Sequence, residues 1–154
     1  PNGSSKKIEV VAVTVALEVI ARYEALFRAA GFHPGAVTTS MLAALHLYNG
    51  DGVAVFAKLS GRVLTVAVLA DQAIKLFRCV MLEEANEDEI LSVLHPTFAY
   101  VEDELNVPVG KLILCGFPQP PRGLRCEIEP LRSQFGAPGG FNAGLLGFLE
   151  SVDH

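Results

Sequence analysis

Few side chains in this chain are of a type that could act as a nucleophile or bind a metal ion. The three cysteines, Cys79, Cys115 and Cys126, are odd in number and form no CxxC pair. No candidate base stands near Cys79 or Cys115, which argues against thiol catalysis. The odd number of cysteines without a CxxC motif also favours a protein of a reducing compartment over a secreted, disulfide-bonded one. The four histidines lie apart in the sequence, so we expect surface or structural roles for them.

The densest group of carboxylates is Glu83–Glu89, with five acidic residues in seven positions. Asn86 and Glu89 have the spacing of a helix N-cap and its third residue, and acidic side chains suit a helix N-terminus. We therefore interpret this run as a helix start and not as a metal site. A two-metal nuclease of the ribonuclease H type needs a carboxylate midway along its opening strand. The opening apolar run offers only Glu9, near its beginning, so that class is disfavoured.

Composition narrows the class of protein further. Hydrophobic residues make up 51% of the 154 residues, charged residues 19%, and the net charge is −5. These values are typical of a folded α/β protein, and without a basic cluster we expect no nucleic-acid partner. No apolar run is long enough to cross a bilayer, and we expect no signal peptide. We expect residues 1–7 to be disordered or a cloning remnant, and 8–154 to be a single domain, part of a longer protein.

The chain is organised around Val53–Leu82, in which three apolar runs are separated by Ser60-Gly61 and Asp71-Gln72. Short turn-like breaks between β-branched runs predict a three-stranded antiparallel meander. Both alternating faces of the first two runs are apolar. Strands of this kind lie in a sheet that is covered on both sides, usually by helices.

The segments before the meander predict two strands and two helices. Ile8–Val15 is almost entirely apolar and is predicted to be a central strand. Leu17–Ala30 has one apolar helical face and ends at Gly31, as helices often do. A short run at Ala36–Thr39 is predicted to be a second, parallel strand. Ser40 is then expected to cap a helix over Met41–Tyr48.

The segments after the meander alternate between helix and strand. A long helix is predicted after Asn86, and Pro96 within it should kink the helix or split it in two. Lys111–Cys115 is predicted to be a short buried strand, followed by a stiff proline-rich loop at Gly116–Gly123. A strand at Arg125–Glu129 and a last helix at Ala143–Glu150, capped by Asn142, complete the order. Gly144 and Gly147 weaken that helix unless they allow close backbone packing.

The order and spacing of four segments resemble one known superfamily. They are VAVTVALEVIARYEALFRAAGFHPGAVTTSMLAAL, the meander with Arg78 late in its third run, the helix with Phe98-Ala99-Tyr100 before KLILCG, and the tail CEIEPLR…NAGLLGFL. Together they resemble the ribonuclease-H-like core of actin-like ATPases. Within that superfamily they resemble the PilM and GspL type of bacterial type IV pilus and type II secretion assembly proteins. The resemblance implies a mixed sheet with flanking helices and a cleft that binds ATP.

The resemblance also implies which positions would line the nucleotide cleft: Lys58, Ser60, Gly61, Thr65 and Gly116. Here the chain departs from the family pattern. Lys58 stands where an aspartate should hold Mg²⁺, and Ser60 stands where the first glycine of the phosphate hairpin belongs. Gly116 is followed by Phe117 and Pro118, although the family's adenosine loop continues with small residues. The other phosphate hairpin would lie before Ile8, where no such motif is found.

These departures predict little or no ATP hydrolysis, because a lysine can contact a phosphate but cannot hold Mg²⁺. We therefore expect a non-catalytic scaffold domain without a cofactor. Its expected partners are other proteins of an envelope assembly machine, at the cytoplasmic face of the inner membrane, with self-association possible. The alternative is a genuine ATP- and Mg²⁺-binding protein whose first phosphate motif lies outside this sequence. A soluble α/β domain unrelated to this superfamily also remains open.

Overall fold

The computed structural model describes residues 10–153. The chain divides into two compact units, Pro1–Val37 and Thr38–His154, and each is described by itself. The predictions for residues 1–7 and for Ile8 and Glu9 lie outside the described residues. The expectation of a single domain over 8–154 stays a prediction.

The described part of the first unit contains one helix, α1 (Leu17–Ala29). Its predicted end is confirmed, because Gly31 has a φ of +84°. The Gly31 N–H donates to the Arg28 carbonyl at 3.0 Å and the Phe32 N–H to the Phe27 carbonyl at 2.9 Å. This is the Schellman arrangement, in which a glycine lets the chain leave the helix while the last carbonyls stay paired.

Two strands predicted from the apolar runs before the meander are wrong. Val10–Val15, the described part of the predicted central strand, forms no strand, and neither does Ala36–Thr39. In the part of the chain that the structure describes, the strands of the sheet lie between Val53 and Pro130. An apolar run predicts that a segment can extend, but a strand also needs a neighbouring backbone to bond with.

The second unit is an α/β domain with a five-stranded mixed sheet in the order β3-β2-β1-β4-β5. The strands are β1 (Val53–Ser60), β2 (Val63–Ala70), β3 (Ala73–Met81), β4 (Lys111–Cys115) and β5 (Glu127–Pro130). The first three form the predicted antiparallel meander, and β4 and β5 continue the sheet in parallel to β1. The meander and the strand at Lys111–Cys115 are thus confirmed. The strand predicted at Arg125–Glu129 begins two residues later than expected.

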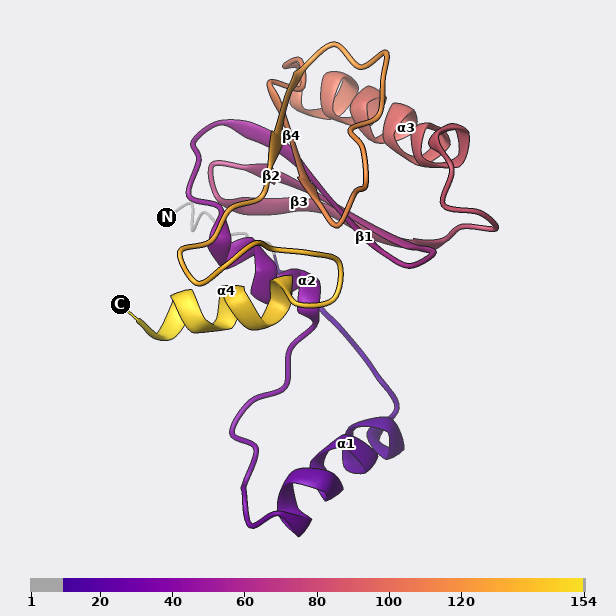
Figure 1. The fold of residues 1–154 in the computed structure, drawn as a ribbon. Coiled ribbons are helices and arrows are strands. Elements are labelled where there is room, and N and C mark those ends of the chain that lie inside the picture. Colours follow the sequence, from indigo (N-terminus) through magenta and orange to yellow (C-terminus); the bar gives the residue numbers. More distant parts are fainter. Residues whose placement is uncertain (1–9, 154) are drawn as a thin grey trace, which may run out of the picture. The chain divides into compact units, whose positions relative to one another are not determined.

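Helices cover both faces of this sheet, as the apolar strands predicted (Figure 1). Helix α3 (Glu87–Leu105) lies on one face, and α2 (Ser40–Ala44) and α4 (Ala143–Val152) lie on the other. A single 3-10 turn, η1 (Leu45–Leu47), extends α2. None of the described helices combines the length and the apolar character that crossing a membrane requires.

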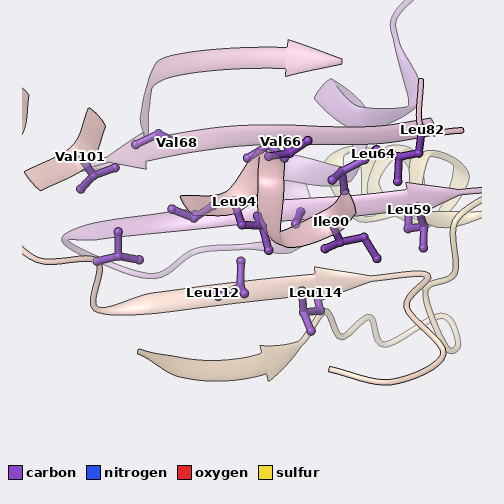
Figure 2. Packing of buried hydrophobic residues seen from close by; sticks show 14 residues of the cluster. Leu59, Leu64, Val66, Val68, Leu82, Ile90, Leu94, Val101, Leu112 and Leu114 are labelled. Carbon is purple, nitrogen blue, oxygen red and sulfur yellow. The ribbon is translucent and has the colours of Figure 1, made fainter. Parts of the chain in front are cut away.

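The face under α3 is the larger core, and it is entirely aliphatic around its centre (Figure 2). Leu94 of α3 is 0% exposed and packs among Leu64 and Val66 of β2 and Leu112 of β4. At about 25 cal/mol for each Å² of apolar surface buried, this layer supplies much of the driving force for folding.

The start of α3 follows the prediction in part. Asn86 is the N-cap, and its side chain accepts from the Glu89 N–H at 2.9 Å. The Glu89 carboxylate does not return to Asn86; it accepts from the backbone N–H groups of Glu83 and Glu84. It therefore fixes the loop that enters the helix, and the acidic run is a helix start as expected.

Pro96 lies inside α3 without ending it, so of the two predicted effects, a kink or a split, the split does not occur. Proline removes one backbone donor, which leaves the Ser92 carbonyl without its helical partner. Ser92 and Pro96 are both exposed, so water can satisfy that carbonyl. The next residue, buried Thr97, donates its hydroxyl to the Val93 carbonyl at 2.8 Å.

Helices α2 and α4 pack together through glycines. A Cβ on Gly144 would lie 2.7 Å from the Ser40 Cα, and one on Gly147 would lie 2.9 Å from the Ala44 Cα. Both distances are too short for a real side chain, so the glycines let the two backbones approach. This confirms the packing role that the sequence left open. The predicted cap of α2 is off by one residue, because Thr39 and not Ser40 accepts from the Leu42 N–H.

Candidate functional site

The candidate site begins at the turn between β1 and β2. Ser60 pairs with Val63, so only Gly61 and Arg62 lie in the loop. Gly61 has a φ of +60°, which a two-residue hairpin favours at its first loop position. The turn is therefore fixed by hairpin geometry, and it holds the end of β1 in one place.

Strand register aligns four chemically active side chains in one row across the sheet. Lys58 on β1 is opposite Thr65 on β2, and Thr65 is opposite Cys79 on β3. On the other side, Lys58 is aligned with Cys115 on β4. Aligned residues of neighbouring strands point to the same face, so all four lie on the face that α2 and α4 cover. The row is Cys79, Thr65, Lys58, Cys115.

Lys58 is the most unusual member of the row because its side chain is only 5% exposed. Its Nζ donates to the Ser60 hydroxyl at 2.6 Å, and Ser60 in turn donates to the Gly140 carbonyl at 2.5 Å. Burial lowers the pKa of Lys58, since desolvation disfavours the ammonium, and the thiols of Cys115 and Cys79 oppose this effect. Within residues 10–153, no carboxylate is among its partners.

The two thiols of the row differ in their surroundings. Cys115 is buried, and its thiol contacts the Gly139 carbonyl at 3.4 Å. Burial raises the pKa of Cys115 to about 11, with Lys58 opposing the shift, so this thiol stays protonated at neutral pH. Cys79 is exposed and accepts from the Thr65 hydroxyl at 3.5 Å.

The backbones around Leu59, Gly116 and Gly140 approach one another closely at the end of β1. A Cβ on Gly116, whose φ is +76°, would collide with the Leu59 carbonyl oxygen and would lie 2.6 Å from the Gly140 nitrogen. A Cβ on Gly140 would collide with the same oxygen and lie 3.0 Å from the Ser60 Cα. These glycines therefore allow the chain to approach itself. A glycine that admits a phosphate would have open space beside it.

The structure brings the five predicted site residues together only in part. Lys58, Ser60 and Thr65 share one sheet face, and Gly116 closes against the end of β1. Gly61 is set apart in the turn, and a Cβ there would lie 3.9 Å from the Phe141 ring.

The sequence alone missed one part of this site. The Gly139 carbonyl accepts from the Cys115 thiol and the Gly140 carbonyl from the Ser60 hydroxyl, and the sequence did not point to either glycine as part of the site. The available signal was the glycine pair itself, since two adjacent glycines outside a hairpin can mark a close backbone approach.

The proline-rich loop, Gly116–Gly123, lines a groove that Gly116 shares with the candidate site. It has a volume of about 640 Å³ and is mostly apolar. The Glu87 carboxylate accepts from the Arg122 backbone N–H at 2.6 Å and so fixes the loop to the start of α3. The groove lies at the carboxyl ends of β4 and β5, where ligands of α/β sheets commonly bind. Its lining residues are Leu114, Gly116, Phe117, Pro118, Gln119, Pro120, Pro121, Arg122, Ile128, Pro130, Leu131 and Pro138.

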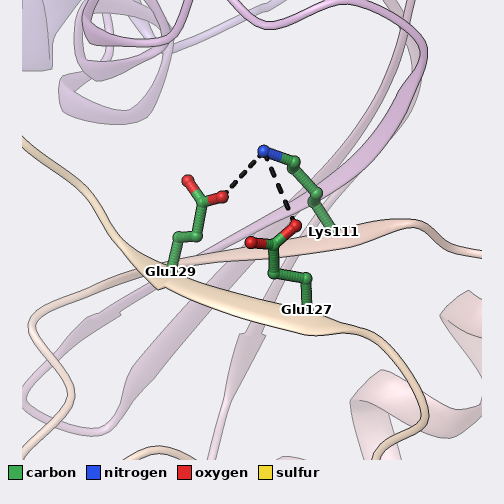
Figure 3. Close-up of polar contacts among 3 residues, drawn as sticks. All are labelled: Lys111, Glu127 and Glu129. Carbon is green, nitrogen blue, oxygen red and sulfur yellow. Dashed lines mark hydrogen bonds and ion pairs between the residues drawn. The ribbon is translucent and has the colours of Figure 1, made fainter.

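A second charged group lies between β4 and β5 and is structural. Lys111 contacts Glu129 at 2.7 Å and Glu127 at 3.7 Å (Figure 3). The Glu129 hydrogen bond raises the pKa of Lys111, and the same bond lowers the pKa of Glu129. All three side chains are well exposed. This group stabilises the register of a short edge strand, as cross-strand pairs do.

Among residues 10–153 no group of three or more histidine, cysteine or acidic side chains is arranged to hold a metal ion. The chain matches no model of a known protein family, and a comparison with curated proteins finds no match.

Proposed function

We propose that this protein is a non-catalytic, actin-like scaffold domain of a bacterial type IV pilus or type II secretion assembly machine. It would bind other proteins of the machine at the cytoplasmic face of the inner membrane. The proposal is supported by the order of a meander, a crossover helix and a parallel strand ending in glycine, which agrees with the family resemblance. The observation that carries it is the chain of hydrogen bonds from Lys58 through Ser60 to Gly140.

This hydrogen-bonded chain argues against nucleotide binding on physical grounds. Phosphate and Mg²⁺ would need open space beside glycines and a carboxylate for the metal. Here the backbones of Leu59, Gly116 and Gly140 occupy that space themselves. The buried cation at position 58 satisfies its hydrogen bond within the protein. The positions that would line a nucleotide cleft in an ATPase thus make hydrogen bonds and close backbone contacts with one another in this protein.

The alternative remains an ATP-binding protein that uses Lys58, Ser60, Gly61, Thr65 and Gly116. It is favoured by one observation: a buried lysine can neutralise a phosphate. Titration calorimetry of the intact gene product with Mg-ATP separates the two functions. We expect no binding heat at millimolar nucleotide. Sub-millimolar affinity that is lost in Lys58→Glu but kept in Lys111→Gln, a lysine outside the cluster, would overturn the scaffold proposal.

The groove of the proline-rich loop is the surface we expect a partner peptide to use. Proline and aromatic side chains form a stiff apolar lining, which needs little ordering on binding. The test is titration of a peptide from the cytoplasmic tail of a membrane-anchored component, followed by fluorescence anisotropy. Phe117→Ser, a change in the lining, should weaken binding about tenfold. Arg132→Ser, outside the groove, should not, and equal loss in both variants would contradict this assignment.

A further inference from the structure

Strand β3 forms one edge of the sheet, and part of its backbone has no partner in the described protein. The Leu82 N–H donates to the Arg62 carbonyl at 2.8 Å, so these two residues are a hydrogen-bonded pair of the antiparallel ladder. Such a ladder alternates between pairs that exchange hydrogen bonds and pairs that do not. The backbone groups of Phe77, Cys79 and Met81 therefore point away from β2. Among residues 10–153 no hydrogen-bond partner is found for them.

Sheet edges are usually protected, and this part of β3 is an exception. The opposite edge strand, β5, has four residues, ends at Pro130 and carries acids that contact Lys111. The start of β3 is protected by a bulge at Lys75, whose carbonyl accepts from the Tyr100 hydroxyl at 3.3 Å. The stretch 77–81 has neither a bulge nor a proline. It is about 14 Å long, which is enough to pair with a strand of five residues.

The two faces of this edge differ in their side chains. Cys79 is aligned with Thr65 and lies on the face that α2 and α4 cover, and Met81 lies on the same face. Cys79 is exposed, and Met81 is 67% exposed. Arg78 is aligned with Val66 of the core under α3, so it lies on the other face. Arg78 takes part in none of the ion pairs of the described residues. A strand added here would meet apolar surface on one face and a cation on the other.

The charges of β3 indicate which strand fits this edge. The strand contains Lys75 and Arg78 and no carboxylate, although the whole protein has a net charge of −5. A second copy of β3 would place these cations beside their own copies, and like charges on neighbouring strands are destabilising. A strand with carboxylates on one face would pair with Arg78, and apolar residues on its other face would cover Met81. Charge complementarity therefore favours an acidic strand of another protein.

We propose that residues 77–81 of β3 bind an extended segment of a partner protein, with alternating acidic and apolar residues, as a sixth strand of the sheet. This inference rests on the proposed scaffold function for the existence of a protein partner. Backbone hydrogen bonds supply the affinity of an added strand, and Arg78 and Met81 supply the preference for its side chains. The groove of the proline-rich loop is lined from β4 and β5, at the other edge of the sheet. The scaffold can therefore hold two partners at once.

The probe is a fluorescein-labelled peptide with the sequence Thr-Val-Glu-Val-Glu-Val-Thr. A matched peptide has lysine at both glutamate positions. Fluorescence anisotropy should show binding of the glutamate peptide, and binding of the lysine peptide should be at least about tenfold weaker. Arg78→Glu should reverse this preference, because it replaces the cation of the edge by a carboxylate. Arg125→Glu, at an exposed arginine outside the meander, should leave the preference unchanged.

Methylation of backbone nitrogens tests whether the peptide binds as a strand. In an added strand, alternate N–H groups face the neighbouring strand and the others face away from it. Two further peptides are N-methylated, one at its valines and the other at its glutamates. One of them should lose at least about tenfold in affinity, and the other should bind as the unmodified peptide does. Equal losses in the two peptides would overturn the proposal.

Three other results would also overturn it. They are no binding of the glutamate peptide at about millimolar concentration, equal effects of Arg78→Glu and Arg125→Glu, and a dimer in sedimentation velocity that the glutamate peptide dissociates. The dimer would mean that a second copy occupies the edge. Circular dichroism should show that both variants keep the fold. Nucleotide binding in the calorimetric test would contradict the scaffold function, whereas the peptide measurements would still decide whether β3 accepts a sixth strand.

Discussion

The two faces of the sheet are built differently, although the same strands form both. The face under α3 is packed by aliphatic side chains around Leu94. The face under α2 and α4 has the polar row with Lys58 and depends on glycines that let backbones touch. The first face tolerates changes that preserve volume, because aliphatic cores can repack. The second depends on positions where no side chain fits, and it is also the face where the family resemblance places a ligand.

Gly147→Val should have the largest effect on stability, and it tests the face under α2 and α4. A Cβ at this position would collide with the Ala43 carbonyl oxygen, so α4 could not remain in place. We expect a loss of about 4 kcal/mol or more in the free energy of unfolding, measured by urea denaturation. Ser151→Ala, at an exposed position of the same helix, is the control. A loss below about 1 kcal/mol would mean that the two helices can separate without harm.

Leu94→Ala tests the face under α3 in the same denaturation assay. Leu94 is 0% exposed, and its truncation leaves a cavity between α3 and the sheet. The expected loss is about 3 kcal/mol, and Leu94→Met should lose less than about 1.5 kcal/mol because it nearly conserves volume. If Leu94→Met were as harmful as Leu94→Ala, this face would be as intolerant as the other.

Lys58→Met should change the stability at neutral pH by less than about 1 kcal/mol, or increase it, because it removes a buried charge and leaves the Ser60–Gly140 hydrogen bond intact. Its pH dependence is the sharper test. The pKa of Lys58 is lowered from 10.5 in the folded state. At pH values between the lowered pKa and 10.5, the unfolded chain therefore binds more protons than the folded one. Stability of the wild type should therefore rise, relative to Lys58→Met, as pH approaches 10.5. A parallel pH profile for the two proteins would contradict the buried position of Lys58.

Cys115 should show the opposite pH dependence. Its folded pKa is raised from 9.0 to about 11, so its contribution to stability is complete below pH 9 and is lost as pH rises toward 11. Comparison of the wild type with Cys115→Ala across this range isolates the effect. A difference between the two proteins that is constant from pH 8 to 11 would show that the thiol is not buried as described.

The smallest effect concerns thiol reactivity, which should distinguish the exposed end of the row from the buried one. Cys79 is exposed, and Cys115 is buried. A colorimetric thiol reagent should therefore modify Cys79 in the folded protein and Cys115 only after unfolding. Cys126 is partly exposed, so the comparison is made in a Cys126→Ser background, where Cys79→Ser should remove the fast phase without changing stability. Rapid modification of Cys115 in the Cys79→Ser variant would mean that the loop at Gly139–Gly140 opens readily.

The sequence was sufficient for the parts of the fold that depend on local signals. The meander, the helix cap at Asn86 and the strand at Lys111–Cys115 were predicted from periodicity, turn residues and cap spacing. The strands predicted at Ile8–Val15 and Ala36–Thr39 were wrong within the described residues. Apolar β-branched residues favour extension, but they do not supply the neighbouring strand that completes the hydrogen bonds.

The candidate site also has one part that the sequence could predict and one part that it could not. Its side chain types could be read from the sequence, including the lysine at position 58 that argues against Mg²⁺ binding. The alignment of Lys58 with Cys115, and the contact of Gly140 with Ser60, could not, because these residues are far apart in the chain. Strand register and close backbone approach are decided by packing between segments. Only the tertiary structure thus showed that the end of β1 is in close contact with the backbone at Gly116 and Gly140.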